Sequence, residues 1–307
     1  MRRLLLPLAL LTAALALPSS ASAAYTLGVS DQQARVFSSP LFAPLHFKAA
    51  RYIAPYDVMS SPTDEAVMRD WIAGARRRHV RILLSLEHSR QPGKERHLPS
   101  VSEYTRELRK IKRAFPFIRE FSPWNEANRF QSSTSTAGQP TKGQERRLAQ
   151  FYMAARKVFG KRTTYVALDL LDEQNVNKTI TFMRKFLRYA KPRPTVLGFH
   201  NYSDTNRFSQ TRTKRVLRAW GKTMWLTETG GIVKLGRAFE FSTQRAARAL
   251  GCMFDIARDN KRVKRLYVYQ FHGDVPGARF DAGLTDVTGT VKRPGYTVVQ
   301  RKRARNC

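Results

Sequence analysis

The chain has 307 residues, of which 42% are hydrophobic, and a formal net charge of +32 because 55 Lys and Arg stand against 23 Asp and Glu. This hydrophobic share is sufficient for a sizeable folded core. The basic residues are spread along the whole chain, which argues against a nucleic-acid partner and favours a solvated basic surface that associates with anionic cell-wall polymer.

The first 23 residues have the pattern of a secretory signal peptide. Arg2 and Arg3 precede an apolar run over residues 4–17, and the small residues Ala21-Ser22-Ala23 follow it. The run is too short for a comfortable membrane span, with an uncleaved anchor as the alternative, and we expect no span after cleavage. The sequence therefore predicts a secreted or cell-wall-associated protein whose mature chain starts near Ala24.

Residues 24–307 contain no internal repeat and no long low-complexity linker, so we expect one domain and a monomer. The two cysteines are Cys252 and Cys307. In an exported protein this even count favours a disulfide that ties a late helix to the end of the chain, and two unpaired thiols are the alternative.

Eight apolar runs alternate with amphipathic segments from Tyr25 onward. Such continuous apolar runs are typical of parallel strands that are buried on both faces. They cover residues 25–30, 50–56 and 80–86, a run leading into Trp124, residues 164–170 and 195–202, a run ending at Glu228, and residues 266–272.

Helix-start signals separate several of these runs. Ser61 before Pro62 and Ser242 are expected N-caps, and Ser100 with Glu103 has the spacing of a capping box. The connection after the first run is irregular, with room for about one helical turn.

Repeated strand–helix units in a domain of this length predict an α/β fold, a (β/α)8 TIM barrel formed by residues 24–307. An open doubly wound sheet is the alternative. That fold normally has a Gly-rich phosphate loop after the first strand, and Gly28 stands alone there.

In a barrel of this kind the carboxyl ends of the strands meet on one face, which holds the active site. Ionisable, amide and aromatic residues stand at the predicted strand ends: Arg51, Glu87, His88, Trp124, Asn125, Glu126, His200, Tyr202, Glu228, Tyr269, Gln270, Phe271 and His272. Aromatic rings and polar groups together suit a sugar. A metal site is the alternative, but no short-range ligand pattern supports it, so we expect no metal and no cofactor.

Glu126 and Glu228 each follow an apolar run, and burying a carboxylate is costly unless it has partners. As a pair, one carboxyl would protonate a leaving oxygen and the other would attack as a nucleophile. The alternative is that either glutamate is a structural ion-pair partner of one of the many arginines.

The sequences Trp124-Asn125-Glu126 at the fourth run and Thr227-Glu228 at the seventh resemble the motif pair of clan A glycoside hydrolases. The resemblance implies that Glu126 is the general acid/base and Glu228 the nucleophile. It further implies substrate-binding or orienting roles for the residues around them: Arg51 beneath the nucleophile, Trp124, Asn125 at the sugar 2-hydroxyl, His200, and Tyr202 against Glu228. Many members have a Trp at the end of the eighth strand, where this chain has Phe271 as the candidate sugar platform.

These observations predict an exported retaining glycoside hydrolase that cleaves a β-linked poly- or oligosaccharide with two glutamates. One alternative is a catalytically inactive barrel that binds carbohydrate or cell wall. The other is a basic exported protein that binds anionic polymer and uses the barrel as a scaffold. The identity of the sugar and the linkage stays open at this point.

Overall fold

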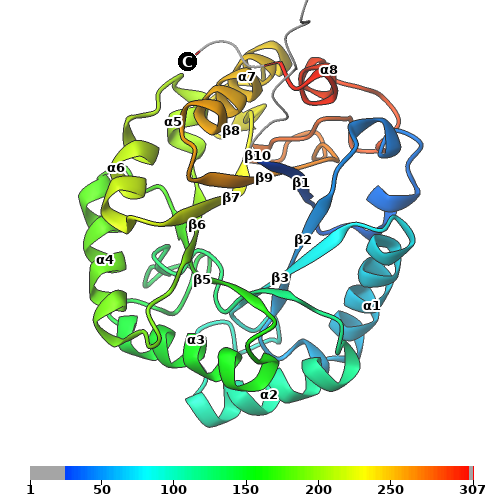
Figure 1. Ribbon diagram of the computed structural model, residues 1–307. Coiled ribbons are helices and arrows are strands. Elements are labelled where there is room, and N and C mark those ends of the chain that lie inside the picture. Colours follow the sequence, from blue (N-terminus) through cyan, green and yellow to red (C-terminus); the bar gives the residue numbers. More distant parts are fainter. Residues whose placement is uncertain (1–24, 304–306) are drawn as a thin grey trace, which may run out of the picture.

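The structure is a computed structural model that describes residues 25–303 and 307, so the predicted signal peptide lies outside the described residues. Eight parallel strands close into a barrel, and helices surround it (Figure 1). The barrel strands, in order around it, are β1 (Thr26–Ser30), β2 (Ala49–Pro55), β3 (Arg81–Glu87), β4 (Glu120–Ser122), β5 (Thr164–Leu171), β6 (Val196–His200), β7 (Thr223–Thr229) and β9 (Val263–Val268). The predicted TIM barrel is confirmed.

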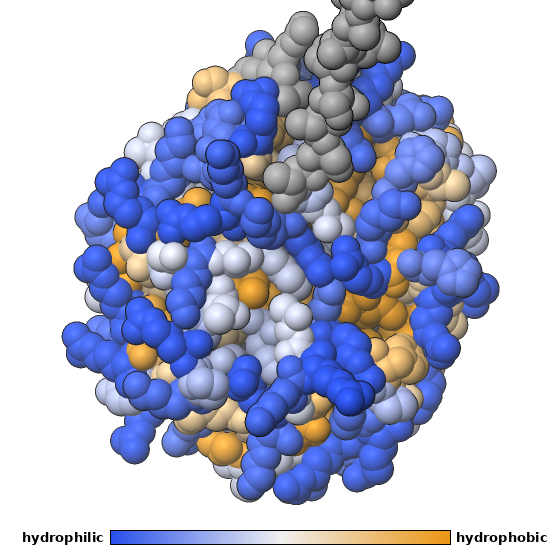
Figure 2. Space-filling model, viewed as in Figure 1, coloured by the Kyte–Doolittle hydropathy of each residue, from blue (hydrophilic) through white to orange (hydrophobic). Residues whose placement is uncertain are grey.

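The helices that follow the strands form the outer layer. They are α1 (Pro62–Arg77), α2 (Val101–Ala114), α3 (Glu145–Phe159), α4 (Val176–Tyr189), α5 (Tyr202–Asn206), α6 (Thr211–Trp220), α7 (Thr243–Asp259) and α8 (Pro294–Arg301). On the face shown in Figure 2, hydrophilic residues lie around the rim, with hydrophobic patches between them. Among the described residues, no helix has both the length and the apolar character that a membrane span requires.

The helix-start signals act as the sequence predicts. The Ser61 hydroxyl accepts a hydrogen bond from the backbone N–H of Asp64, and Ser100 and Glu103 form a reciprocal capping box at α2. Ser242 caps α7 in the same way. Each cap pairs backbone donors that the first helical turn would otherwise leave unsatisfied.

Several connections differ from the expected pattern. Two short 3₁₀ helices, η1 (Ala34–Ser38) and η2 (Ala43–Leu45), follow β1, and a third, η3 (Val58–Ser60), precedes α1. A small antiparallel ribbon that the sequence did not predict pairs β8 (Lys234–Leu235) with β10 (Phe280–Asp281). The expected Cys252–Cys307 disulfide is present and joins α7 to the last residue.

The barrel interior has an apolar layer toward the amino ends of the strands, made by Ala49, Leu83, Val166, Val196, Trp225 and Tyr267. Because side chains alternate along a strand, Arg51 and Ser85 point into the same interior two residues further on. The alternation is interrupted in β5, where the register shifts between Val166 and Asp169. This shift lets Asp169 point inward and contact Arg51, so that a polar layer lies on the apolar one.

Candidate active site

A cavity of about 620 Å³ opens at the carboxyl ends of the strands, and both motif glutamates line it. The other lining residues are Arg129, Leu171, Asp172, Gln174, Tyr202, Ser203, Arg207, Ile232, Leu235, Ala238, Phe239, Tyr269, Arg279 and Phe280. The loop that carries β8 and the loop that carries β10 together supply Leu235, Phe239, Arg279 and Phe280. The unpredicted ribbon therefore builds one wall of the cavity.

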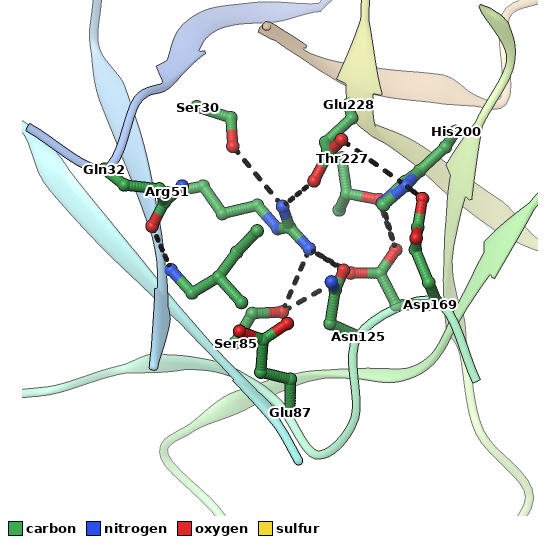
Figure 3. A network of polar contacts seen from close by, with 12 residues as sticks. Ser30, Gln32, Arg51, Ser85, Glu87, Asn125, Asp169, His200, Thr227 and Glu228 are labelled. Atoms are coloured by element: carbon green, nitrogen blue, oxygen red, sulfur yellow. Dashed lines mark hydrogen bonds and ion pairs between the residues drawn. The ribbon is translucent and has the colours of Figure 1, made fainter. Parts of the chain in front are cut away.

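The cavity floor is organised around Arg51, which is fully buried on β2 (Figure 3). One guanidinium nitrogen donates to Glu228 Oε1 at 2.7 Å, and the other donates to Asn125 Oδ1 at 2.6 Å and Asp169 Oδ2 at 2.8 Å. Burial by itself would lower the pKa of Arg51, but the charges of Asp169 and Glu228 outweigh it and raise the pKa. Arg51 is therefore a permanent cation beneath the site.

Glu228 lies near the end of β7, where the strand register shifts between Leu226 and Thr229. Arg51 holds its Oε1, and the Tyr202 hydroxyl donates to Oε2 at 3.0 Å. Two oriented donors, one of them charged, hold the carboxylate in place. Tyr202 itself begins α5 instead of ending the sixth strand, because β6 stops at His200.

Glu126 follows the three-residue strand β4 and has a left-handed backbone, with φ of 42°. Its Oε1 lies 3.1 Å from His200 Nδ1, and its Oε2 accepts from Arg129 Nη1 at 2.8 Å. Burial would raise the pKa of Glu126, but the hydrogen bond and charge of His200 and the charge of Arg129 outweigh it and lower the pKa to about 2. A non-glycine residue in this backbone region is uncommon and is often found at functional sites.

His200 lies among three carboxylates at the end of β6. Its Nδ1 is 3.1 Å from Glu126 and 3.6 Å from Glu228, and its Nε2 is 3.2 Å from Asp169 Oδ1. Burial opposes the charged imidazole, but the negative charges of Glu228 and Asp169 outweigh it and raise the pKa of His200 to about 10. Three cations, His200, Arg51 and Arg129, thus contact the carboxylates of Glu126, Glu228 and Asp169.

A carboxylate oxygen of Glu126, a ring nitrogen of His200 and a carboxylate oxygen of Glu228 all lie within 4.8 Å of one another. Three such groups have the spacing of metal ligands, but Arg51, Arg129 and the protonated His200 already supply positive charge to the same carboxylates. The same separation suits two carboxyl groups that act on opposite sides of one glycosidic bond.

Of the remaining predicted residues, Asn125 belongs to the polar network, whereas Trp124 and Phe271 are packed in the core. Asn125 lies in the network, where its side-chain oxygen accepts from Arg51. Trp124 is buried: its ring stacks on Phe151 and its indole N–H donates to Gln139. Phe271 is 0% exposed and packs against Phe42.

Neither Trp124 nor Phe271 lines the cavity. The prediction that Phe271 is a sugar platform is therefore wrong. The eighth strand, β9, ends at Val268, and the chain beyond it turns the Phe271 ring into the core. The aromatic rings that do line the cavity belong to Tyr202, Phe239, Tyr269 and Phe280.

Two residues of the site were missed by sequence reasoning. Asp169 is fully buried, accepts from Arg51 and Thr227, and lies beside His200. A lone carboxylate inside an apolar run was the signal that could have found it. Arg129 is three residues after Glu126 and pairs with it, but nothing in the sequence distinguishes it from the many other arginines.

Comparisons with known proteins agree with this arrangement. Residues 124–297 match the family model described as "Glycosyl hydrolase catalytic core". A comparison with curated proteins finds no match.

Among solved structures, a Streptomyces cattleya protein, GH5_18 in complex with GlcNAc, superposes with a TM-score of 0.64 at 15% identity, covering 90% of this chain and 79% of that one. Xylanase 10B of Thermotoga petrophila RKU-1 with xylobiose gives 0.63 at 14% identity, covering 91% and 94%. A fungal beta-1,4-galactanase gives 0.64 at 12% identity, covering 90% and 99%. At these identities the likeness concerns the fold.

Proposed function

Because the chain belongs to the glycosyl hydrolase catalytic core family, we propose that it is an exported, retaining glycosidase that cleaves β-linked poly- or oligosaccharide by double displacement. The observation that carries this proposal is the pair Glu126 and Glu228, which line one cavity and each offer a carboxylate oxygen within 4.8 Å of the other. A separation of this order fits a direct attack on the sugar by one carboxylate, without an intervening water.

In the proposed mechanism Glu228 is the nucleophile. Arg51 and Tyr202 donate hydrogen bonds to its two oxygens, and the carboxylate attacks the anomeric carbon. The glycosyl–enzyme ester then forms as the leaving oxygen departs. Tyr202 and Arg51 contact the carboxylate before attack, so they also fix its orientation toward the cavity.

Glu126 is the general acid/base in this mechanism, and it must gain a proton before the leaving oxygen departs. Of the two cations that hold it ionised, His200 is fully buried, whereas the Arg129 side chain is 51% exposed and can rotate away. Substrate that displaces Arg129 would raise the Glu126 pKa toward the range of a working acid. In the second step Glu126 accepts a proton from the water that hydrolyses the ester.

A second candidate function is a barrel that binds carbohydrate without cleaving it. The observation that favours it is the lowered pKa of Glu126, about 2, with both carboxylate oxygens engaged by His200 and Arg129. This candidate keeps the cavity and its aromatic rings but assigns the carboxylates to ion pairs. Activity measurements separate the two candidates.

The test is hydrolysis of a panel that includes β-1,4-xylan, β-1,4-galactan, β-mannan, β-glucans and aryl β-glycosides, with Glu126→Ala and Glu228→Ala beside the wild type. We expect both variants to lose activity, and azide to restore Glu228→Ala while giving a glycosyl azide of inverted configuration. A folded wild-type protein that binds glycan but cleaves nothing on this panel would support the binding barrel instead.

The proposal of export rests on the signal-peptide pattern of residues 1–23. Expression of the full chain in a secreting host, followed by N-terminal sequencing of the released protein, tests it. A mature N-terminus near Ala24 is the expected result. Retention of an intact Met1 in the membrane fraction would contradict it and favour the uncleaved anchor.

A further inference from the structure

Arginine side chains gather on the wall of the cavity that faces away from the barrel core. Arg207, which follows α5, and Arg279, just before β10, both line the cavity and are exposed. Within residues 25–303 and 307, neither has a carboxylate within ion-pair distance, and the Arg207 guanidinium donates to the Ser203 hydroxyl at 3.2 Å. Two exposed guanidinium groups without a carboxylate partner make this wall of the cavity attractive to an anionic ligand.

The basic surface continues beyond this cavity. A second cavity of about 380 Å³ adjoins the first, because Gln174, Ser203 and Arg207 line both. Arg212 and Arg215 also line it, and they donate to neutral oxygens, those of the Glu173 carbonyl and the Asn177 amide. Its carboxylate, Asp204, is 1% exposed and accepts the backbone N–H groups of Arg212 and Thr213.

The acidic groups of the main cavity do not cancel this charge. Glu126 and Glu228 are already engaged by Arg129, His200 and Arg51. Asp172 is buried, its carboxyl accepts the backbone N–H of Ser203, and burial raises its pKa well above its usual range. The Arg207 guanidinium lies 5.4 Å and the Arg245 guanidinium 4.9 Å from the centre of the Phe239 ring, so two cations lie over one aromatic ring of the cavity wall.

We propose that the cavity takes a glycan that carries anionic groups, carboxylate or sulfate, and that Arg207 and Arg279 bind the anionic group beside the sugar bound at the two glutamates. The planar guanidinium matches both anions in two-point hydrogen bonding, which a neutral hydroxyl does not offer. This inference rests on the proposed function and adds the substrate class to it.

The test compares neutral glycans with partners of the same backbone that carry an anionic group. β-1,4-Glucan, β-1,3-glucan, β-mannan and β-xylan oligosaccharides are the neutral members. For the first three, the partners are oxidised at C6 to the uronate or sulfated at the same position; xylan is paired with its glucuronic-acid-substituted form. Hydrolysis and equilibrium binding are both measured, so that a ligand that binds without being cleaved is still detected. The carboxylate and sulfate arms show which anion the arginines accept.

The decisive variant is Arg207→Gln/Arg279→Gln. We expect kcat/KM on the anionic partner to fall by about 10-fold to 100-fold, with less than about 2-fold change on the neutral partner. Its matched control is Arg109→Gln/Arg113→Gln on α2, which removes the same charge from exposed arginines that line a different cavity. The control should keep the wild-type kcat/KM on both substrates. A general effect of net charge would instead lower kcat/KM equally in the two double variants.

The outcomes separate this inference from the proposed function. If the wild type cleaves a neutral glycan and its anionic partner with equal kcat/KM, the inference is overturned and the proposed glycosidase activity still stands. Equal losses in the two double variants also overturn it, since the effect would then come from net charge. Tight binding of an anionic glycan that depends on Arg207 and Arg279, without cleavage, supports the inference and counts against the proposed activity.

Discussion

The barrel contains buried ion pairs at each end, and the two ends differ in how many charged groups they bring together. At the amino ends of the strands, both guanidinium nitrogens of Arg265 donate to the Glu120 carboxylate, and the guanidinium lies 3.9 Å from the centre of the Trp225 ring. One cation meets one anion, and an aromatic ring covers the pair.

At the carboxyl ends, Arg51, His200 and Arg129 contact three carboxylates, two of which line the active-site cavity. Similar residue types thus make an isolated ion pair at one end and a network of three cations and three carboxylates at the other. Burial of charge by itself does not mark function. Several carboxylates that share cations within one cavity do.

Removing a glutamate at each end of the barrel should have opposite consequences: loss of activity at the carboxyl ends of the strands and loss of stability at the amino ends. Glu228→Ala should lower kcat/KM by about 10⁴-fold in a folded protein, because it removes the proposed nucleophile. Glu120→Ala should lower the free energy of unfolding by about 3–5 kcal/mol, because it leaves Arg265 buried without its anion. The folded fraction of that variant should keep its activity. Steady-state kinetics measures kcat/KM, and denaturant unfolding measures the free energy of unfolding. Loss of activity in folded Glu120→Ala would contradict the purely structural role of the Glu120–Arg265 pair.

The next effect is a pH dependence of stability that comes from His200, at the carboxyl ends of the strands. The pKa of His200 is raised to about 10, so its contribution is complete below the unfolded value near 6.5 and is lost as the pH rises through about 10. Over this window the free energy of unfolding should fall by up to about 1.4 kcal/mol per pH unit more in wild type than in His200→Gln. His97→Gln, which alters a half-exposed histidine, is the control. Parallel curves for wild type and His200→Gln would contradict the charged state of His200.

A smaller effect concerns Asp169, which acts through its neighbours and does not line the cavity. Asp169→Asn keeps the size of the side chain and removes the charge that holds Arg51 and His200. We expect kcat to fall by about 10-fold to 100-fold with KM little changed, because the carboxylates lose their alignment. NMR titration of His200 should also give a pKa below that of wild type, a shift that a purely structural role would not produce.

The smallest expected effect is a change in the pH profile of activity. Arg129→Gln removes a charge and a hydrogen bond that lower the pKa of Glu126. That pKa should rise, so the proton-donating form should persist to higher pH and the alkaline limb of kcat/KM should move up by about one pH unit. Arg129→Lys keeps the charge and should show a smaller shift. A downward movement of the limb would exclude Arg129 as the cation that holds Glu126 ionised.

Much of the architecture is determined locally and could be predicted from the sequence. The capping residues Ser61, Ser100 and Ser242 start their helices, because each satisfies backbone donors within its own turn. The apolar runs place Glu126 and Glu228 beyond buried strands, and a barrel brings all such strand ends to one face. Arg51, Asn125, His200 and Tyr202 also lie in the predicted region, since each is at or next to a strand end.

Tertiary packing determines which side chains contact one another and which face the cavity. Asp169 enters the site because a register shift in β5 breaks the two-residue alternation, and Gly198 on β6 leaves room for its carboxylate. Trp124 and Phe271 turn into the core, whereas Phe239 and Phe280 reach the cavity on a ribbon of two short strands. A strand is specified by neighbouring residues, but the direction of a ring on a loop depends on contacts between distant segments, which sequence periodicity does not encode.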